Sequence, residues 1–143
     1  MASVIREITI AAPPAVVWDA LADFGRVHER LVPGFVTEAH PGPDDRTRVV
    51  TFFTGAVARE RLVGADAEAR RLAYTVEDGP LGATHHNSSA QVLDDGAGGS
   101  RFVWVTDVLP DALAEPVGAL MDRGIEVIRL TLGSVPGGAA APR

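Results

Sequence analysis

The part of the sequence richest in chemistry is residues 84–91, THHNSSAQ, which opens with six polar side chains in a row. Residues 84–93 have the pattern of one strand, and the side chains of a strand alternate between two faces. His86 and Ser88 therefore share a face with the apolar Ala90 and Val92. We expect this face to point inward, where each polar group needs a partner or a ligand. His86 and Ser88 are the first candidates for a functional site.

Proton transfer is the chemistry that a histidine in such a position offers, because imidazole exchanges protons near neutral pH. His86 is therefore a candidate catalytic residue. Two alternatives stay open, a core histidine that a neighbour satisfies and a strand that faces solvent. We expect neither a metal nor a cofactor. His85 and His86 are adjacent and point to opposite faces, and no third ligand follows at a recognisable spacing.

A second candidate for proton transfer is Glu60, which shares a strand face with Leu62 and should point inward. A buried carboxylate near a histidine can orient the imidazole or, with a raised pKa, carry protons itself. The alternative is a cross-strand ion pair with a nearby arginine, for which Arg48, Arg59 and Arg61 are available.

Four further side chains are candidates for contact with a ligand. Tyr74, the only tyrosine, could donate a hydrogen bond to a ligand carbonyl. Phe102 and Trp104 lie two residues apart on one strand and share a face, where a flat indole favours a planar ligand. Met121 lies in the apolar stripe of a predicted helix. Plain core packing is the alternative for the aromatic residues.

The elements that must position these side chains follow an unusual order. A first strand near residues 4–10 precedes two short helices at 14–23 and 26–31, and a long helix over 113–132 ends the pattern. Pro116 should either kink the long helix or mark a fresh start. Between them lie six strands separated by turn residues, at 35–40, 46–53, 56–65, 71–77, 84–93 and 101–109.

These elements predict an α+β fold in which a curved, seven-stranded antiparallel sheet wraps around the long C-terminal helix. A strongly twisted sheet of this width curls. One helix, about 10 Å across with its side chains, cannot fill the concave face of such a sheet. A cavity should therefore remain between sheet and helix.

The order and several motifs resemble the polyketide cyclase/dehydrase and lipid transport superfamily, the START-like or Bet v 1-like helix-grip proteins also called SRPBCC. The resemblance covers residues 3–132 and rests on ITIAAPPAVVWDALADF, Glu60-Arg61-Leu62, Leu72, Tyr74 and Val76 before Gly79-Pro80, and Arg101-Phe102-Val103-Trp104 with Pro110. Many relatives carry a tryptophan after the first helix pair, where this chain has HERLVPG, so the entrance to the cavity should differ.

The resemblance implies a hydrophobic cavity for a small lipid-like or aromatic polyketide-like ligand. The first hypothesis for function is therefore a binding or transport protein. The alternative is an enzyme of the polyketide cyclase or dehydratase type, in which His86 with Glu60 supplies general acid–base catalysis. An interaction module that uses the edge of the sheet is the third. Relatives often pair, which leaves a homodimer open as well.

Composition narrows the remaining choices. All thirteen basic residues are arginine and cysteine is absent, which excludes lysine Schiff bases, thiolate nucleophiles, disulfides and cysteine-based zinc sites. A net charge of -6 argues against a nucleic-acid partner. No apolar run approaches the ~20 residues that a bilayer span needs, so stable membrane insertion is not expected. Because MASVIREITI lacks the features of a secretory signal, we expect a cytoplasmic protein. We also expect one domain over residues 1–132 and a disordered tail over 133–143.

Overall fold

The computed structural model describes residues 1–133. The disordered tail predicted for residues 133–143 lies outside this range except for Gly133, which ends the last helix. The elements are β1 (Ala2–Ile10), α1 (Pro14–Ala22), the 3-10 turn η1 (Phe24–Arg26), α2 (Val27–Arg30), β2 (Val36–Pro41), β3 (Thr47–Phe52), β4 (Val57–Asp66), β5 (Arg71–Asp78), β6 (His85–Asp94), β7 (Ser100–Leu109), the 3-10 turn η2 (Asp111–Leu113) and α3 (Ala114–Gly133).

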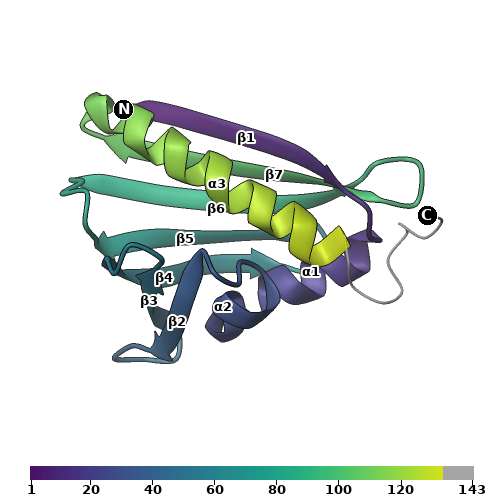
Figure 1. The fold of residues 1–143 in the computed structure, drawn as a ribbon, viewed down its shortest axis with the longest axis horizontal. Helices are drawn as coiled ribbons and strands as arrows, with labels where there is room; N and C mark the ends of the chain where they lie inside the picture. The colour runs from purple at the N-terminus through teal and green to yellow at the C-terminus, as the bar shows by residue number, and fades with distance from the viewer. Residues whose placement is uncertain (134–143) are drawn as a thin grey trace.

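The strands form one antiparallel sheet of seven strands, in the order β1-β7-β6-β5-β4-β3-β2. Strands β2 to β7 pair in chain order, and β1 lies at the edge beside β7. Helix α3 crosses one face of the sheet in front of β1, β7 and β6, and α1 and α2 lie toward its C-terminal end (Figure 1). The predicted helix-grip fold, with its curved sheet and two short helices after the first strand, is confirmed.

Prolines lie where both longer helices begin. Pro13 lies at the N-cap position of α1, and Pro14 is the first residue of the helix. Helix α3 begins at Ala114 and is continuous through Pro116, so the predicted fresh start at this residue is wrong. Pro116 lies in the first helical turn, whose N–H groups have no acceptor within the helix, and a proline there removes no hydrogen bond.

The apolar stripe of α3 packs on the sheet, as its helical spacing predicts. Its C-terminal half, with Ile128 and Leu132, joins Val17 and Leu21 of α1 in the larger core. Its N-terminal half, with Met121, belongs to a smaller cluster beside β1 and β7. The larger and the smaller core lie at opposite ends of α3. The size of any cavity between the sheet and the helix therefore depends on the side chains that lie between the two cores.

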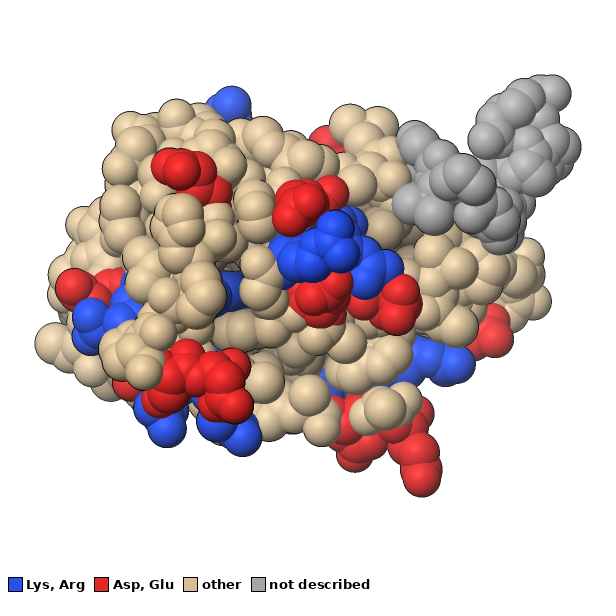
Figure 2. Space-filling view, turned by 90° about the horizontal axis from the view of Figure 1, so that it is seen from below, with Lys and Arg blue, Asp and Glu red and all other residues tan. Residues whose placement is uncertain are grey.

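The surface carries interspersed charges. Figure 2 shows arginine side chains next to acidic ones, and no continuous basic surface on the face that it presents. Such a face offers no track for a phosphate backbone. No helix within residues 1–133 is long and apolar enough to cross a membrane.

Candidate functional site

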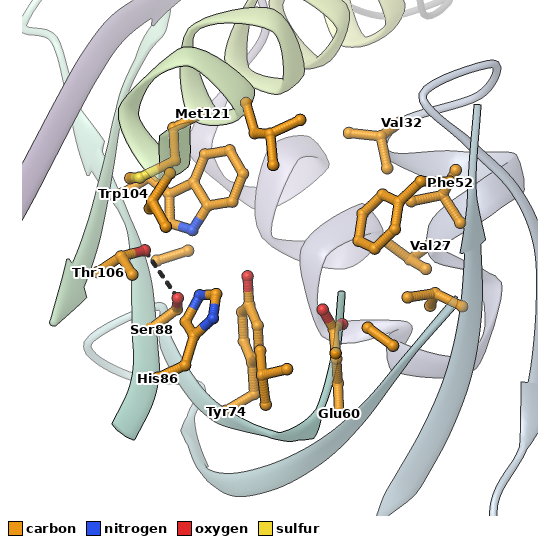
Figure 3. A pocket seen from close by; sticks show the side chains of 18 of the residues that line it. Val27, Val32, Phe52, Glu60, Tyr74, His86, Ser88, Trp104, Thr106 and Met121 are labelled. Carbon is orange, nitrogen blue, oxygen red and sulfur yellow. Dashed lines mark hydrogen bonds between the residues drawn. The ribbon is translucent and has the colours of Figure 1, made fainter. Parts of the chain in front are cut away.

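A cavity of about 200 Å³ lies between the sheet and α3. One end is apolar, where Val27 of α2 and the following Val32 lie across from Phe52 of β3 (Figure 3). The gap expected beneath the lone helix is therefore present. It exceeds the ~150 Å³ apolar cavity that is known to take up benzene.

The opposite end of the cavity is polar. His86 and Ser88 of β6 line it, together with Thr106 of β7 (Figure 3). The Ser88 and Thr106 hydroxyl groups lie 2.8 Å apart in a hydrogen bond in which either can donate. Ser88 is buried and His85 is exposed, so the predicted alternation along β6 is correct. The polar end thus has two hydroxyl groups that satisfy each other beside an imidazole.

The surroundings of His86 favour its neutral form. Burial lowers its pKa, and the nearby His85 acts in the same direction, while the negative charge of Glu60 opposes both. A neutral imidazole has one nitrogen that donates and one that accepts a hydrogen bond. His86 can therefore serve as a proton acceptor or as a neutral hydrogen-bonding group.

Tyr74 of β5 lies next to this polar end, and its hydroxyl points into the cavity (Figure 3). Burial raises the pKa of Tyr74 to about 12, and Glu60 adds to the increase. Arg48 and hydrogen bonding with the side chains of Ser88 and Trp104 act against it. The phenol therefore stays protonated at neutral pH.

Aromatic and thioether side chains close the cavity toward α3 and β7. Trp104 is partly buried, and Phe102 and Met121 are almost fully buried. All three line the cavity and also pack in the core. Ligand contact and core packing are therefore compatible interpretations of these residues.

Glu60 of β4 is buried in an ion pair with Arg48 of β3. The Nε of Arg48 donates to Oε1 of Glu60 over 2.8 Å, and both residues are 7% exposed. Of the three arginines proposed as partners, Arg48 is the one observed, since Arg59 contacts Glu77 and Arg61 contacts Asp44. Glu60 does point inward as expected, but its carboxylate is already engaged.

Arg48 makes further contacts on the cavity wall. Its Nη1 donates to the backbone carbonyl of Phe24 over 3.0 Å. Its guanidinium lies over the Phe24 ring at 3.8 Å from the centroid, and 5.2 Å from that of Tyr74. Cation–π contacts of this kind strengthen when the pair is desolvated.

The cavity opens beside the connection between β5 and β6. Among the described residues that line it, the exposed ones are Glu77, Asp78, Pro80 and Gly82. Val117 and Leu120 of α3 also line this part of the wall. The opening is therefore formed by a short loop and one helical turn.

All seven predicted site residues line this one cavity. Sequence reasoning missed Thr106 and the loop at the opening, and it considered Arg48 only as a partner for Glu60. Thr106 lies two residues after Trp104 on the same face of the same strand. Strand alternation could therefore have predicted that Thr106 lines the cavity. Within residues 1–133, no three histidine, aspartate or glutamate side chains gather as a metal-binding group would.

Comparison with known proteins gives a family and a fold. Residues 1–130 match the family described as "Polyketide cyclase / dehydrase and lipid transport". No curated protein matches the chain. Solved structures with the same fold include the protein XoxI from Bacillus cereus, with a TM-score of 0.84 and 18% identity over 94% of this chain and 97% of that one.

Two more solved structures are similar over nearly their full length. A protein from Thermobifida fusca is 27% identical, with a TM-score of 0.76 over 96% of this chain and 97% of its own. A putative uncharacterised protein from Bacillus thuringiensis is 16% identical, with a TM-score of 0.82 over 92% of this chain and 98% of its own.

Proposed function

Because the chain belongs to the polyketide cyclase/dehydrase and lipid transport family, we propose that its cavity binds a small, largely apolar molecule with a flat ring and a hydrogen-bonding oxygen. The observation that carries this proposal is a cavity of about 200 Å³ with one apolar and one polar end. Ligand sites are typically apolar pockets in which a few polar groups fix the orientation.

The polar end suits an oxygen rather than a long alkyl chain. Tyr74, protonated at neutral pH, donates a hydrogen bond, and His86 can donate or accept one. Ser88 can redirect its hydroxyl from Thr106 to a ligand without leaving the cavity wall. A ring between Trp104 and Val27 would then bring its oxygen substituent to these groups.

The test is calorimetric binding of 2-naphthol, a flat probe with one hydroxyl group. Ala90→Leu adds bulk to the cavity wall and should weaken binding by about tenfold or more, the equivalent of ~1.4 kcal/mol. Ala119→Leu makes the same change at an exposed position of α3 and should leave binding unchanged. Circular dichroism checks that both variants fold. Equal affinity of both variants, or no binding by the wild type, would refute the proposal.

A second candidate function is acid–base catalysis of the cyclase or dehydratase type, which the neutral imidazole of His86 favours. His86 would remove a proton from a carbon between two carbonyl groups, and Tyr74 would donate a hydrogen bond to the enolate oxygen. Acid–base catalysis of this kind contributes ~10²- to 10⁴-fold in rate. Glu60 would act through its charge, since its carboxylate is bonded to Arg48.

Binding and turnover separate these two functions. His86→Ala should keep its affinity for 2-naphthol within a few fold and abolish any turnover of an aromatic poly-ketone substrate. His40→Ala, the same change at a histidine whose side chain is 64% exposed, serves as the matched control that retains turnover. If His86→Ala turns the substrate over at the wild-type rate, His86 is not the base.

A further inference from the structure

Charge is distributed unevenly around the cavity. Among the described residues that line it, Arg48 is the one arginine, and the chain contains no lysine. His86 lines the cavity as a neutral imidazole. The recognition of an anionic ligand by a buried cation therefore depends on Arg48.

Arg48 has its strongest contacts within the protein. One nitrogen bonds Glu60 at 2.8 Å and another bonds the Phe24 carbonyl at 3.0 Å. The flat face of the guanidinium is covered by the Phe24 ring. A ligand carboxylate would have to compete with the carboxylate of Glu60, which is already buried and at hydrogen-bonding distance.

The opening adds no cation that could attract an anion. Among the described residues, none of the exposed ones that line it is an arginine. Within residues 1–133, a carboxylate therefore finds no unpaired positive charge in the interior or at its entrance.

We infer that the Arg48–Glu60 pair makes the cavity selective for neutral ligands, so that it takes phenols or ketones and rejects fatty acids and other carboxylates. This inference rests on the proposed binding function and narrows its ligand class. Burying an unpaired charge is costly, whereas a neutral oxygen needs only the hydrogen bonds that Tyr74 and His86 can make. The ion pair lies in the wall as a neutral, preformed unit.

Three probes with the same ring system test the inference. They are 2-naphthol, 2-naphthoate and 2-naphthylmethylamine, which at neutral pH are neutral, anionic and cationic. The wild type should bind the neutral probe at least about tenfold more tightly than either charged probe, the equivalent of ~1.4 kcal/mol. Comparable affinity for naphthoate, or a preference for the amine, would overturn the inference. Failure of all three to bind would instead refute the proposed binding function.

Variants of the ion pair test whether the pair causes the selectivity for neutral ligands. Glu60→Gln keeps the shape of the side chain but frees the charge of Arg48, so naphthoate should gain at least about tenfold in affinity relative to naphthol. The double variant Arg48→Met/Glu60→Gln removes both charges and should retain the preference for naphthol. Glu38→Gln, at an exposed position of β2 outside the cavity lining, should change the ratio by less than about twofold.

Two results would contradict the role of the pair. One is a folded Glu60→Gln protein with the wild-type ratio of affinities, and the other is a double variant that prefers naphthoate. If Glu60→Gln does not fold, the wild-type and double-variant ratios still decide, because the inference requires a preference for the neutral probe in both.

Discussion

Ser88 and Thr106 face each other across β6 and β7, and their hydroxyl groups form a hydrogen bond of 2.8 Å. Ser88 is 2% and Thr106 is 1% exposed. Each hydroxyl thus satisfies the other in the cavity wall, and Ser88 also bonds the Tyr74 hydroxyl.

Removing both partners should cost less than the two single losses added together. Thr106→Val removes this bond and should lower the free energy of unfolding by ~1 kcal/mol, the usual net contribution of one buried hydrogen bond. The double variant Ser88→Ala/Thr106→Val should lose less than the sum of the single variants. Urea denaturation of the four proteins measures this coupling, and strictly additive losses would contradict it.

His86 should make stability depend on pH. Because burial lowers its pKa below the ordinary value of 6.5, the unfolded chain binds the proton more readily. Its contribution is therefore fully present above 6.5 and is lost as the pH falls from there through the lowered pKa. His86→Gln should reduce this acid-side loss, measured by urea denaturation from about pH 8 to about pH 5.

His40 provides the control for this measurement, since its side chain is 64% exposed. His40→Gln should keep the wild-type pH dependence. If both variants follow the wild-type curve, His86 does not titrate with a lowered pKa.

Tyr74 should resist ionisation. Its pKa of about 12 means that the folded protein favours the protonated phenol. The resulting contribution to stability is present below the ordinary pKa of 10.0 and is lost as the pH rises from there toward 12. Because the chain has one tyrosine, the ultraviolet absorbance of phenolate reports this group alone. A midpoint near 10.0 in the folded protein would show that the hydroxyl is solvated.

Gly124 should control the size of the cavity. A Cβ atom there would lie 3.1 Å from Cζ3 of Trp104 and 3.3 Å from Cε2 of Phe35, closer than ordinary contact. Gly124→Ala should therefore push Trp104 toward the cavity and weaken 2-naphthol binding several fold. The strain of ~1–3 kcal/mol offsets the ~1 kcal/mol that alanine adds to helix stability.

Gly133 is the matched control at the end of the same helix, where a Cβ atom would meet no described neighbour within 4 Å. Gly133→Ala should keep the wild-type affinity and unfold at an equal or higher temperature. Calorimetry that finds equal affinity for the two variants would show that the contact with Trp104 does not limit the cavity.

The strands could be predicted because each is bounded by turn residues and alternates in polarity. The strand expected at 84–93 is β6 (His85–Asp94), and its inward face, with Ser88 and Ala90, is as predicted. Helix α3 could be predicted from its apolar spacing, but its start could not. Whether Pro116 begins a helix or lies in its first turn depends on the preceding turn η2, which has no helical period of its own.

The direction of each site side chain could be predicted from the alternation along its strand. Its contacts with residues of neighbouring strands could not. Arg59 and Arg61 lie on the opposite face of β4 from Glu60, so alternation alone could have excluded them. Arg48 meets Glu60 because β3 and β4 pair with these residues opposite each other. That register depends on the turn between the strands, and one residue more or fewer would have turned Arg48 to the other face.

The pairing of β1 with β7 joins the first strand of the sheet to the last, since Ala2 lies opposite Val108. During synthesis β2 to β6 can pair one after another as they emerge, whereas the first strand made must wait until β7 appears. Closing so long a loop costs entropy before the contacts between β1 and β7 can form, and this slows folding. A chain released before residue 100 would carry an unpaired β1 and an open edge on β6, both prone to aggregate.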